Sequence, residues 1–135
     1  MRAPSYTTTS DDRAKWNEAP IQNGLEIVRQ LSPQSYVKVD GDFLDELTED
    51  TKTYPEAGLI AQELHTVLPD AVTVGDEPTP WNVNYNHVLA YALAAIKDLD
   101  AVVQAQAARI AAREAKKTRT SKGLSGRTRS STASE

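Results

Sequence analysis

The chain has 135 residues, a formal net charge of −4 at pH 7 and a hydrophobic fraction of 39%, which allows one compact domain with appendages and a modest core that partner chains can complete. It contains no cysteine, and its two histidines, His65 and His87, lie far apart in the sequence, so we expect no disulfide, no metal site and no cofactor. No apolar run approaches the ~18 residues of a membrane span, and the N-terminus lacks the apolar stretch of a signal peptide, so we expect no membrane association.

The N-terminal segment is predicted to be extended. Residues 1–10 are polar and rich in β-branched threonine, which suits an extended arm or a strand better than a helix. Asp11-Asp12-Arg13 then predicts a turn or a helix cap. Leu25, Val28 and Leu31 recur at helical spacing, which predicts a short amphipathic helix over residues 23–31 that ends at Ser32-Pro33.

The middle of the chain predicts short strands and turns. Side chains alternate over residues 35–39, which indicates a strand, and Asp40-Gly41 indicates a turn after it. The acidic run over residues 42–54 predicts an exposed loop. Residues 58–68 are expected to begin extended and to pass into a helical turn that Pro69-Asp70 closes. Two further strands are expected at residues 71–74 and 81–85, with a loop at residues 78–80 between them.

A long helix is predicted from Asn86 to about Lys117, because this segment is rich in alanine and contains no helix breaker. An apolar heptad runs along it, with Leu89, Ile96, Val103 and Ile110 at a positions and Ala92, Leu99, Gln106 and Arg113 at d positions. As far as Leu99 the helix could pack on its own domain. Beyond Leu99 the rest of the chain is too small to cover a rod of about 45 Å, so we expect a coiled coil between copies.

The last twenty residues, from Lys116, hold six Lys or Arg residues and one acid, with almost no large apolar side chains. This composition predicts a basic tail that is disordered in solution. Its charge leaves a nucleic-acid partner open as an alternative, although the tail has no interleaved aromatic residues, which favours a solvated end.

Ser10 and Lys15 form a candidate catalytic pair, because a serine hydroxyl becomes nucleophilic beside a base and a desolvated lysine can be that base. The pair alone is weak evidence, since Ser10 could equally be a helix N-cap. A spacing of five places the two side chains on different faces of a helix or a strand. The catalytic interpretation therefore requires a bend, and Asp11-Asp12 is a suitable place for it.

Three ordered segments resemble a known family. They are Ser10-Asp11-Asp12-Arg13-Ala14-Lys15-Trp16-Asn17 with Pro20-Ile21, Gly24-Leu25, Leu31-Ser32-Pro33 and Tyr36; Gly58-Leu59-Ile60-Ala61-Gln62-Glu63-Leu64 with Leu68-Pro69-Asp70-Ala71-Val72; and Val83-Asn84-Tyr85 with Ala95-Ile96-Lys97-Asp98-Leu99. Together they resemble the intramolecular chaperone domain of phage endosialidases, tailspikes and tail fibres, which also occurs in the myelin regulatory factor. The resemblance covers about residues 6–104.

The resemblance implies a self-cleaving serine endopeptidase with a Ser-Lys dyad that acts once, in cis. Ser10 would be the nucleophile, Lys15 the base, and the bond between Thr9 and Ser10 the cleavage site. Gln62 and Glu63 match family positions, where a buried hydrogen-bonding role and a catalytic role both remain open. His65 is expected to be a helix-surface histidine, because no acid or serine is placed to form a triad with it.

We therefore expect an α+β fold with a small sheet, short helices and a long C-terminal coiled-coil helix, assembled as a homotrimer. Residues 1–9 would be an arm before the cleavage site, residues 10–117 the chaperone domain with the coiled coil at about 86–117, and residues 118–135 the basic tail. The expected partner is an upstream β-rich tail fibre or tailspike, with no small-molecule ligand, in the virion or in the host cytoplasm during assembly. The alternatives are a non-catalytic trimerisation module of a virion and a nucleic-acid-binding accessory protein. Family domains follow a long fibre, whereas nine residues precede Ser10 here, which suggests an excised domain or a free-standing copy.

Overall fold

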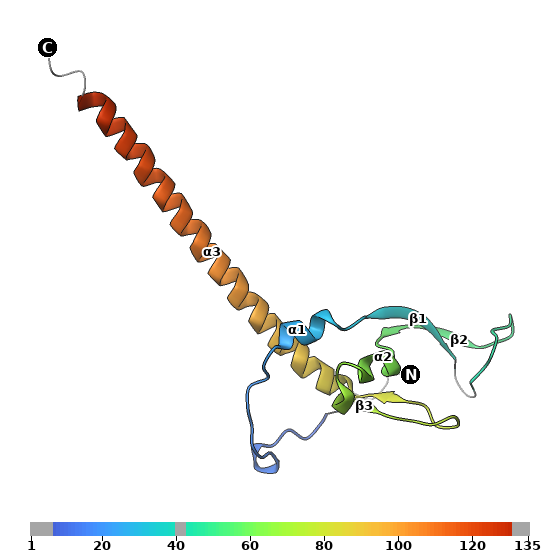
Figure 1. Cartoon of the computed structure of the whole chain (residues 1–135). Helices are drawn as coiled ribbons and strands as arrows, with labels where there is room; N and C mark the ends of the chain where they lie inside the picture. Colours follow the sequence, from blue (N-terminus) through green and yellow to red (C-terminus); the bar gives the residue numbers. More distant parts are fainter. Residues whose placement is uncertain (1–6, 40–42, 131–135) are drawn as a thin grey trace.

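The structure, a computed structural model, describes residues 7–39 and 43–130, with the side chains of the last helix described as far as residue 123. One long helix extends away from a small body of short helices and strands, which confirms the predicted α+β class (Figure 1). In chain order the elements are the 3₁₀ turn η1 (Asp12–Ala14), α1 (Gly24–Arg29), β1 (Gln34–Val39), β2 (Thr53–Gly58), α2 (Ala61–His65), the 3₁₀ turn η2 (Pro69–Ala71), β3 (Val72–Thr73), β4 (Asn82–Val83) and α3 (Tyr85–Ser130).

The described part of the N-terminal arm, residues 7–10, forms no strand with the other described residues. Residues 7–10 have no regular secondary structure, and residues 1–6 lie outside the described part of the chain. β-branched residues favour strands because they pack against cross-strand neighbours. Among the described residues no strand pairs with Thr7, Thr8 or Thr9, so these threonines lack the cross-strand neighbours that would stabilise a strand.

α1 is the short helix that the spacing of Leu25 and Val28 predicted, and it ends before Ser32-Pro33 as expected. It packs on α3 through Gly24, which is buried. A Cβ atom added to Gly24 would lie 2.7 Å from the Cβ of Ala94 and 2.8 Å from the backbone nitrogen of Ala95. The close approach of the two helices therefore depends on a glycine at this position.

β1 and β2 form a two-stranded antiparallel sheet that pairs Tyr36 with Glu56 and Val37 with Pro55. β1 confirms the strand predicted over residues 35–39, and the turn predicted at Asp40-Gly41 lies outside the described residues. The loop predicted over residues 42–54 was wrong at its end, because β2 begins at Thr53. Proline and acidic residues disfavour central strands, but both strands of a two-stranded sheet are edges, where proline is tolerated.

β3 and β4 form a second, smaller antiparallel pair, with Val72 opposite Val83. Both strands are shorter than predicted, because Ala71 belongs to η2 and Tyr85 begins α3. The predicted loop at residues 78–80 is confirmed. It closes by two hydrogen bonds between Asp76 and Thr79, at 3.0 and 2.9 Å.

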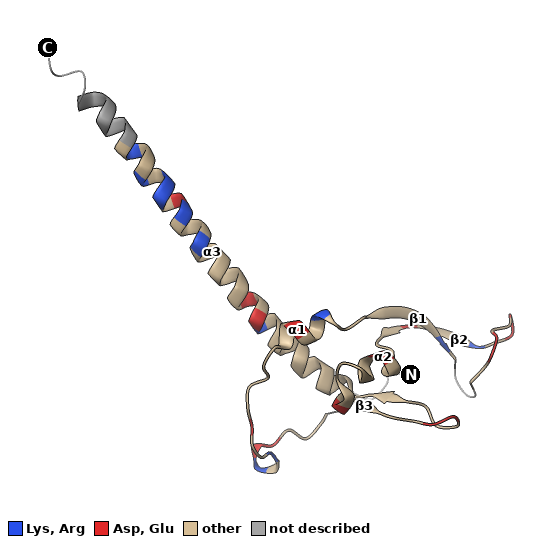
Figure 2. Cartoon of the chain, viewed as in Figure 1, with Lys and Arg blue, Asp and Glu red and all other residues tan. Residues whose placement is uncertain are grey.

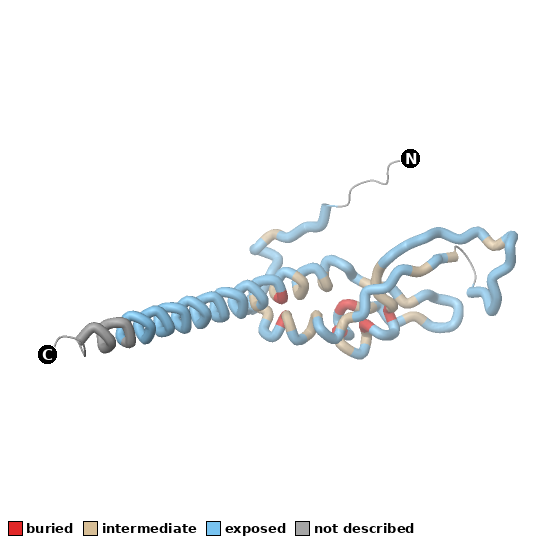
Figure 3. The backbone as a smooth tube through the Cα atoms, turned by 90° about the horizontal axis from the view of Figure 1, so that it is seen from above, coloured by how far each residue is buried: buried red, intermediate tan, exposed pale blue. Residues whose placement is uncertain are grey.

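The core is small and lies where α2 and η2 meet the other elements (Figure 3). Leu64, Leu68 and Ala71 are its buried centre, with exposed fractions of 2%, 6% and 1%. Partly buried side chains surround them from α1, β3, β4, α3 and the connecting segments: Ile27, Leu31, Leu59, Val67, Val72, Val83, Val88 and Tyr91. A core of this size stabilises a chain weakly, which favours completion by other chains.

α3 extends beyond its predicted end at about Lys117 and continues to Ser130, so the segment predicted to be disordered is helical as far as the structure describes it. The helix is about 70 Å long at 1.5 Å per residue. No proline follows Pro80, and the hydroxyls of Thr118 and Thr120 each donate to a backbone carbonyl one turn earlier at 3.0 Å. The domain boundary at residue 117 stays a prediction.

The apolar heptad of α3 is uncovered in the single chain. The a-position side chains of Leu89, Ile96, Val103 and Ile110 are 56%, 63%, 53% and 58% exposed. From Leu99 to Gly123 every residue is exposed. Charge is unevenly distributed as well, because the outer half of α3 carries Lys and Arg while acidic residues lie mostly in the body (Figure 2). A stripe of large apolar side chains on a helix exposed to water marks a surface for association.

Candidate active site

The bend required between Ser10 and Lys15 is present. Asp11 is the N-cap of η1, with backbone φ of −75° and ψ of 131°, and its carboxylate accepts the backbone N–H of Arg13 at 2.9 Å. Lys15 ends the turn in an extended conformation, and its backbone N–H donates to the carbonyl of Asp12 at 2.9 Å. The predicted turn at Asp11-Asp12-Arg13 is therefore confirmed, and it folds the chain back on itself within six residues.

This turn brings the two candidate residues together. The ammonium nitrogen Nζ of Lys15 donates to the Oγ of Ser10 at 2.8 Å. Five residues of regular helix or strand would have pointed these side chains apart. Both residues are exposed in the single chain.

A second interaction in the same turn joins Asp11 to Arg13. The Nε and a terminal nitrogen of the guanidinium donate to the two carboxylate oxygens, at 3.0 and 2.8 Å. The side-chain hydrogen bond from Arg13, and then the one from its backbone N–H, lower the pKa of Asp11 below its usual range. The same bond to Asp11 raises the pKa of Arg13. The carboxylate and the guanidinium thus hold each other in their charged forms.

Chemically, a hydroxyl 2.8 Å from an amine is the minimal arrangement for a serine nucleophile with a lysine base. A neutral amine at this distance could accept the hydroxyl proton and later return it. Loss of the ammonium proton is favoured by removal of the amine from water. In the single chain Lys15 is exposed, so the two candidate side chains are in contact but remain open to water.

Gln62 and Glu63 lie on α2, away from the dyad in sequence, and both are exposed. The buried hydrogen-bonding role considered for them is not seen in the single chain. Glu63 instead accepts a hydrogen bond from the side chain of Gln34 at 3.0 Å, at the start of β1. His65 is half-buried rather than at the helix surface, and its ring meets that of Trp81 edge-on, with centroids 5.5 Å apart.

Residues 10–73 match the model of a peptidase family described as "Chaperone of endosialidase". Residues 10–73 are therefore similar to the chaperone of endosialidase family, and this match spans slightly less than half of the chain. Two relatives are the long tail fiber proteins Gp37 of Enterobacteria phage K3 and Enterobacteria phage T2, each 36% identical over 75 residues. The alignment covers 53% of this chain and 5% of each tail fiber protein, so the chain spans a small part of the length of its curated relatives.

The match to the chaperone of endosialidase family begins at Ser10, the first residue of the dyad, and it includes Lys15. It continues through both residues of α2 that the sequence comparison had singled out, Gln62 and Glu63. It ends at Thr73, so β4 and the whole of α3 lie outside it. The similarity therefore rests on the turn at residues 10–15 and on the body, and the long helix is a feature established by the structure.

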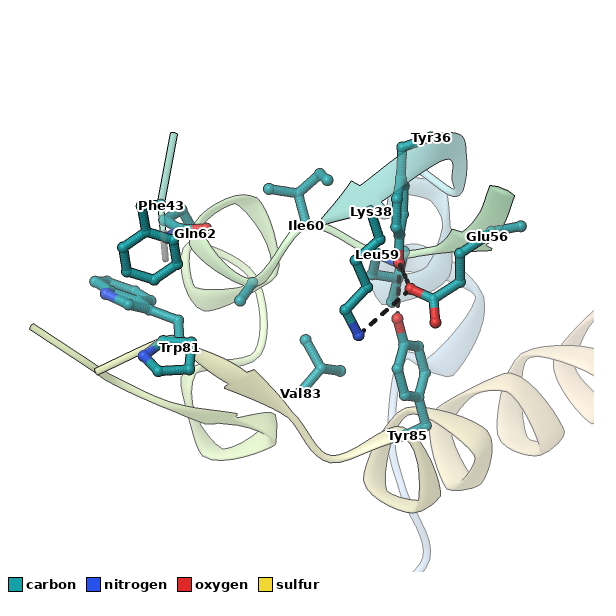
Figure 4. A pocket seen from close by; sticks show the side chains of 13 residues that line it. Tyr36, Lys38, Phe43, Glu56, Leu59, Ile60, Gln62, Trp81, Val83 and Tyr85 are labelled. Atoms are coloured by element: carbon teal, nitrogen blue, oxygen red, sulfur yellow. Dashed lines mark hydrogen bonds and ion pairs between the residues drawn. The ribbon is translucent and has the colours of Figure 1, made fainter. Parts of the chain in front are cut away.

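The matched region, residues 10–73, also contributes to a cavity that sequence reasoning missed. Its volume is about 670 Å³, and it lies between the β1–β2 sheet and the segment that leads into α3 (Figure 4). Phe43, Ile60 and Trp81 line one end. The other end is polar, and Figure 4 shows its side chains pointing toward one another: Tyr36, Lys38, Glu56 and Tyr85.

Hydrogen bonds organise the polar end of this cavity. The hydroxyl of Tyr36 donates to a carboxylate oxygen of Glu56 at 2.9 Å, and Lys38 Nζ lies 3.9 Å from the same oxygen. The hydroxyl of Tyr85 accepts the backbone N–H of Leu59 at 3.0 Å. The hydrogen bond to Glu56 raises the pKa of Tyr36 to about 12. The alternation of side chains along β1 predicts that Tyr36 and Lys38 lie on one face. Their contact with Glu56 could not be predicted, because it depends on the register between β1 and β2.

Within the described residues no group of three or more His, Asp or Glu side chains is arranged to hold a metal ion. No helix of the described residues combines the length and the apolar character that a membrane span requires.

Proposed function

We propose that this chain is a self-cleaving intramolecular chaperone of a phage tail fibre or tailspike, and that it cuts itself between Thr9 and Ser10 with Ser10 and Lys15 as its catalytic dyad. The observation that carries the proposal is the 2.8 Å contact between Lys15 Nζ and Ser10 Oγ at the first residue of the family match. The tail fiber relatives support the assembly context.

In the proposed reaction the neutral amine of Lys15 removes the hydroxyl proton of Ser10 while Oγ attacks the carbonyl carbon of Thr9. The bond between the Thr9 carbonyl carbon and the Ser10 nitrogen then breaks, and Lys15 returns the proton to that nitrogen. An ester between Thr9 and Ser10 Oγ remains. Water hydrolyses this ester, which leaves a carboxylic acid on Thr9 and a free amine on Ser10.

Association between copies would supply what the single chain lacks. A lysine base must be neutral, and removal from water favours its neutral form. Lys15 is exposed, and the neighbouring Trp16 is 85% exposed, so a large aromatic surface beside the dyad is open to another chain. In this proposal, copies of the chain assemble through the exposed heptad of α3, and a neighbouring copy covers the dyad.

We propose a homotrimer, following the three-fold fibres of the family, with the apolar stripe of α3 as the coiled coil. Residues 10–117 would then hold three upstream fibre chains in register, and residues 1–9 would be the arm that ends at the cut. The setting would be the virion or the host cytoplasm during assembly. Once the cut is made, the fibre trimer would keep its assembled state without the chaperone.

A second candidate function is a trimerisation module that does not cleave. The exposure of Lys15 favours it, because a lysine base requires removal from water and the single chain does not provide it. In this case the same fold would align fibre chains and remain attached to them.

The two functions are separated by the mass of the full chain and of a version with a folded reporter fused before Met1. Self-cleavage gives a product that begins at Ser10, and Ser10→Ala, Lys15→Ala and Lys15→Arg each abolish it, the last because a guanidinium stays protonated. Ser32→Ala and Lys97→Ala, which change exposed residues outside the turn, serve as controls and should cleave normally. A parent protein that stays whole while forming its oligomer supports the non-catalytic module. Cleavage of Lys15→Ala at the parent rate contradicts the dyad.

A further inference from the structure

The turn that forms the dyad contains an acid that could disable it. Asp11 follows Ser10 directly and lies four residues before Lys15, so it is a nearby carboxylate for the lysine ammonium. An ion pair between Lys15 and Asp11 would favour the charged lysine and would compete with Ser10 for its Nζ. Neither effect is compatible with a lysine that acts as a base.

The structure shows a different pairing. The Asp11 carboxylate accepts three hydrogen bonds from Arg13, one from the backbone N–H at 2.9 Å and two from the guanidinium at 3.0 and 2.8 Å. Among the described residues the ion pairs join Arg13 to Asp11, Arg29 to Glu26 and Lys38 to Glu56. Lys15 is in none of them and donates to Ser10 instead.

We propose that Arg13 is a positioning residue. By binding the Asp11 carboxylate, it prevents an ion pair between Asp11 and Lys15, so that Lys15 keeps its hydrogen bond to Ser10. This inference rests on the proposed self-cleavage and adds a function for two residues of the same turn. Arginine suits this task, because its planar fork binds a carboxylate at two points and stays charged at every pH at which a lysine can titrate.

Few other charged groups surround the turn. Asp12 and Glu18 are the remaining acids of residues 10–18, and both are exposed. Asp12 meets Lys15 through its backbone carbonyl. Among the described residues no hydrogen bond or ion pair joins this turn to a charged side chain outside residues 10–18. Whether Lys15 binds Ser10 or a carboxylate therefore depends mainly on the residues of this turn.

The test is the pH dependence of the self-cleavage rate in the full chain with its N-terminal reporter, for the parent, Arg13→Gln, Asp11→Asn and the double variant. In Arg13→Gln the released Asp11 captures Lys15, so the pH of half-maximal cleavage should rise by about one unit, which is roughly tenfold in rate below the midpoint. The maximal rate at high pH should stay near that of the parent. The double variant removes the competing charge while asparagine still caps the turn, so its profile should return to that of the parent.

The double variant distinguishes the proposed role of Arg13 from a role in shaping the turn alone. If Arg13 only shapes the turn, the double variant is at least as slow as Arg13→Gln at every pH, and that result overturns the inference. An unchanged profile in Arg13→Gln overturns it too. Arg29→Gln, which breaks the Arg29–Glu26 pair in α1, is the matched control and should leave the profile unchanged.

A second measurement does not need cleavage. The acylation of Lys15 by an amine-reactive reagent is followed against pH by peptide mass spectrometry in the Ser10→Ala background. The pH of half-maximal labelling should rise in Arg13→Gln and return in the double variant. If no protein cleaves but this pattern is seen, the proposed self-cleavage fails and the pairing of Arg13 with Asp11 stands. If labelling is the same in all variants, the pairing has no influence on Lys15 and the inference fails.

Discussion

The side chain of Asp98 in α3 accepts a hydrogen bond from the backbone N–H of Leu25 in α1, at 3.1 Å and across 73 positions of sequence. The first N–H groups of a helix need acceptors from outside the helix. Asn23, which precedes α1, has a left-handed backbone with φ of 59° and makes no side-chain cap. Asp98 therefore caps α1 from another helix, and its negative charge suits the positive end of the helix dipole.

Asp98→Ala should lower the free energy of unfolding by about 1–2 kcal/mol, because it leaves a partly buried N–H of α1 without its acceptor. Asp100→Ala, two residues further along α3 and exposed, should change it by less than about 0.5 kcal/mol. Urea denaturation at one fixed protein concentration measures both. Equal losses in the two variants would contradict the cap.

Gly24→Ala should destabilise the chain by roughly 1–3 kcal/mol, because the added Cβ would lie 2.7 Å from the Cβ of Ala94 and force α1 away from α3. The matched control is Gly123→Ala in the exposed part of α3, where a Cβ has no neighbour within 4 Å. That change should stabilise the helix by about 0.5–1 kcal/mol. Thermal denaturation followed by circular dichroism compares the two, and shifts of the same sign would refute the close packing at Gly24.

Replacing Ile96 and Val103 by Asp should abolish self-association, because both are exposed a positions of the heptad and burying two charges per chain costs several kcal/mol each. The control is Ala101→Asp with Ala108→Asp, which adds the same charges at f positions on the outside of a coiled coil. Light scattering at micromolar concentration gives the molar mass of each. A monomeric parent, or an unchanged oligomer of the Ile96 and Val103 variant, would rule out the coiled coil.

Tyr36 should ionise late in an alkaline titration, because its hydrogen bond to Glu56 raises its pKa to about 12. A raised pKa stabilises the fold below the ordinary tyrosine value of about 10, and this contribution is lost as the pH rises through about 12. Titration of tyrosinate absorbance should show a late component that disappears in Tyr36→Phe. Glu56→Leu, which removes the acceptor, should move that component to lower pH. A late component that persists in Tyr36→Phe would assign it to another residue.

Local patterns in the sequence predicted much of the fold. The spacing of Leu25 and Val28 predicted α1, alternation predicted β1, and the absence of helix breakers predicted α3. The strand β2 was missed because proline disfavours a central strand, and the sequence does not show that β2 is an edge strand of a two-stranded sheet. The end of α3 was placed too early because the polar composition after Lys117 suggested disorder, although no proline stops the helix there.

In the candidate site, too, the sequence predicts the local features and not those that depend on contacts between distant segments. The turn at Asp11-Asp12-Arg13 is local, so the sequence could predict it, and the approach of Lys15 to Ser10 follows from it. The cavity could not be predicted, because Tyr36 and Glu56 meet only through the register of β1 with β2. The side on which another copy would cover Lys15 is a property of the assembly, which the pattern of one chain does not specify.

The described part of the arm before the dyad has a consequence for the energetics of the cut. Residues 7–10 are exposed and contribute nothing to the core at Leu64, Leu68 and Ala71. Hydrolysis at the proposed site Thr9–Ser10 would therefore take no contact of residues 7–9 away from this core. Under the proposed function, the domain released by the cut would keep this core, so it should be recoverable in folded form.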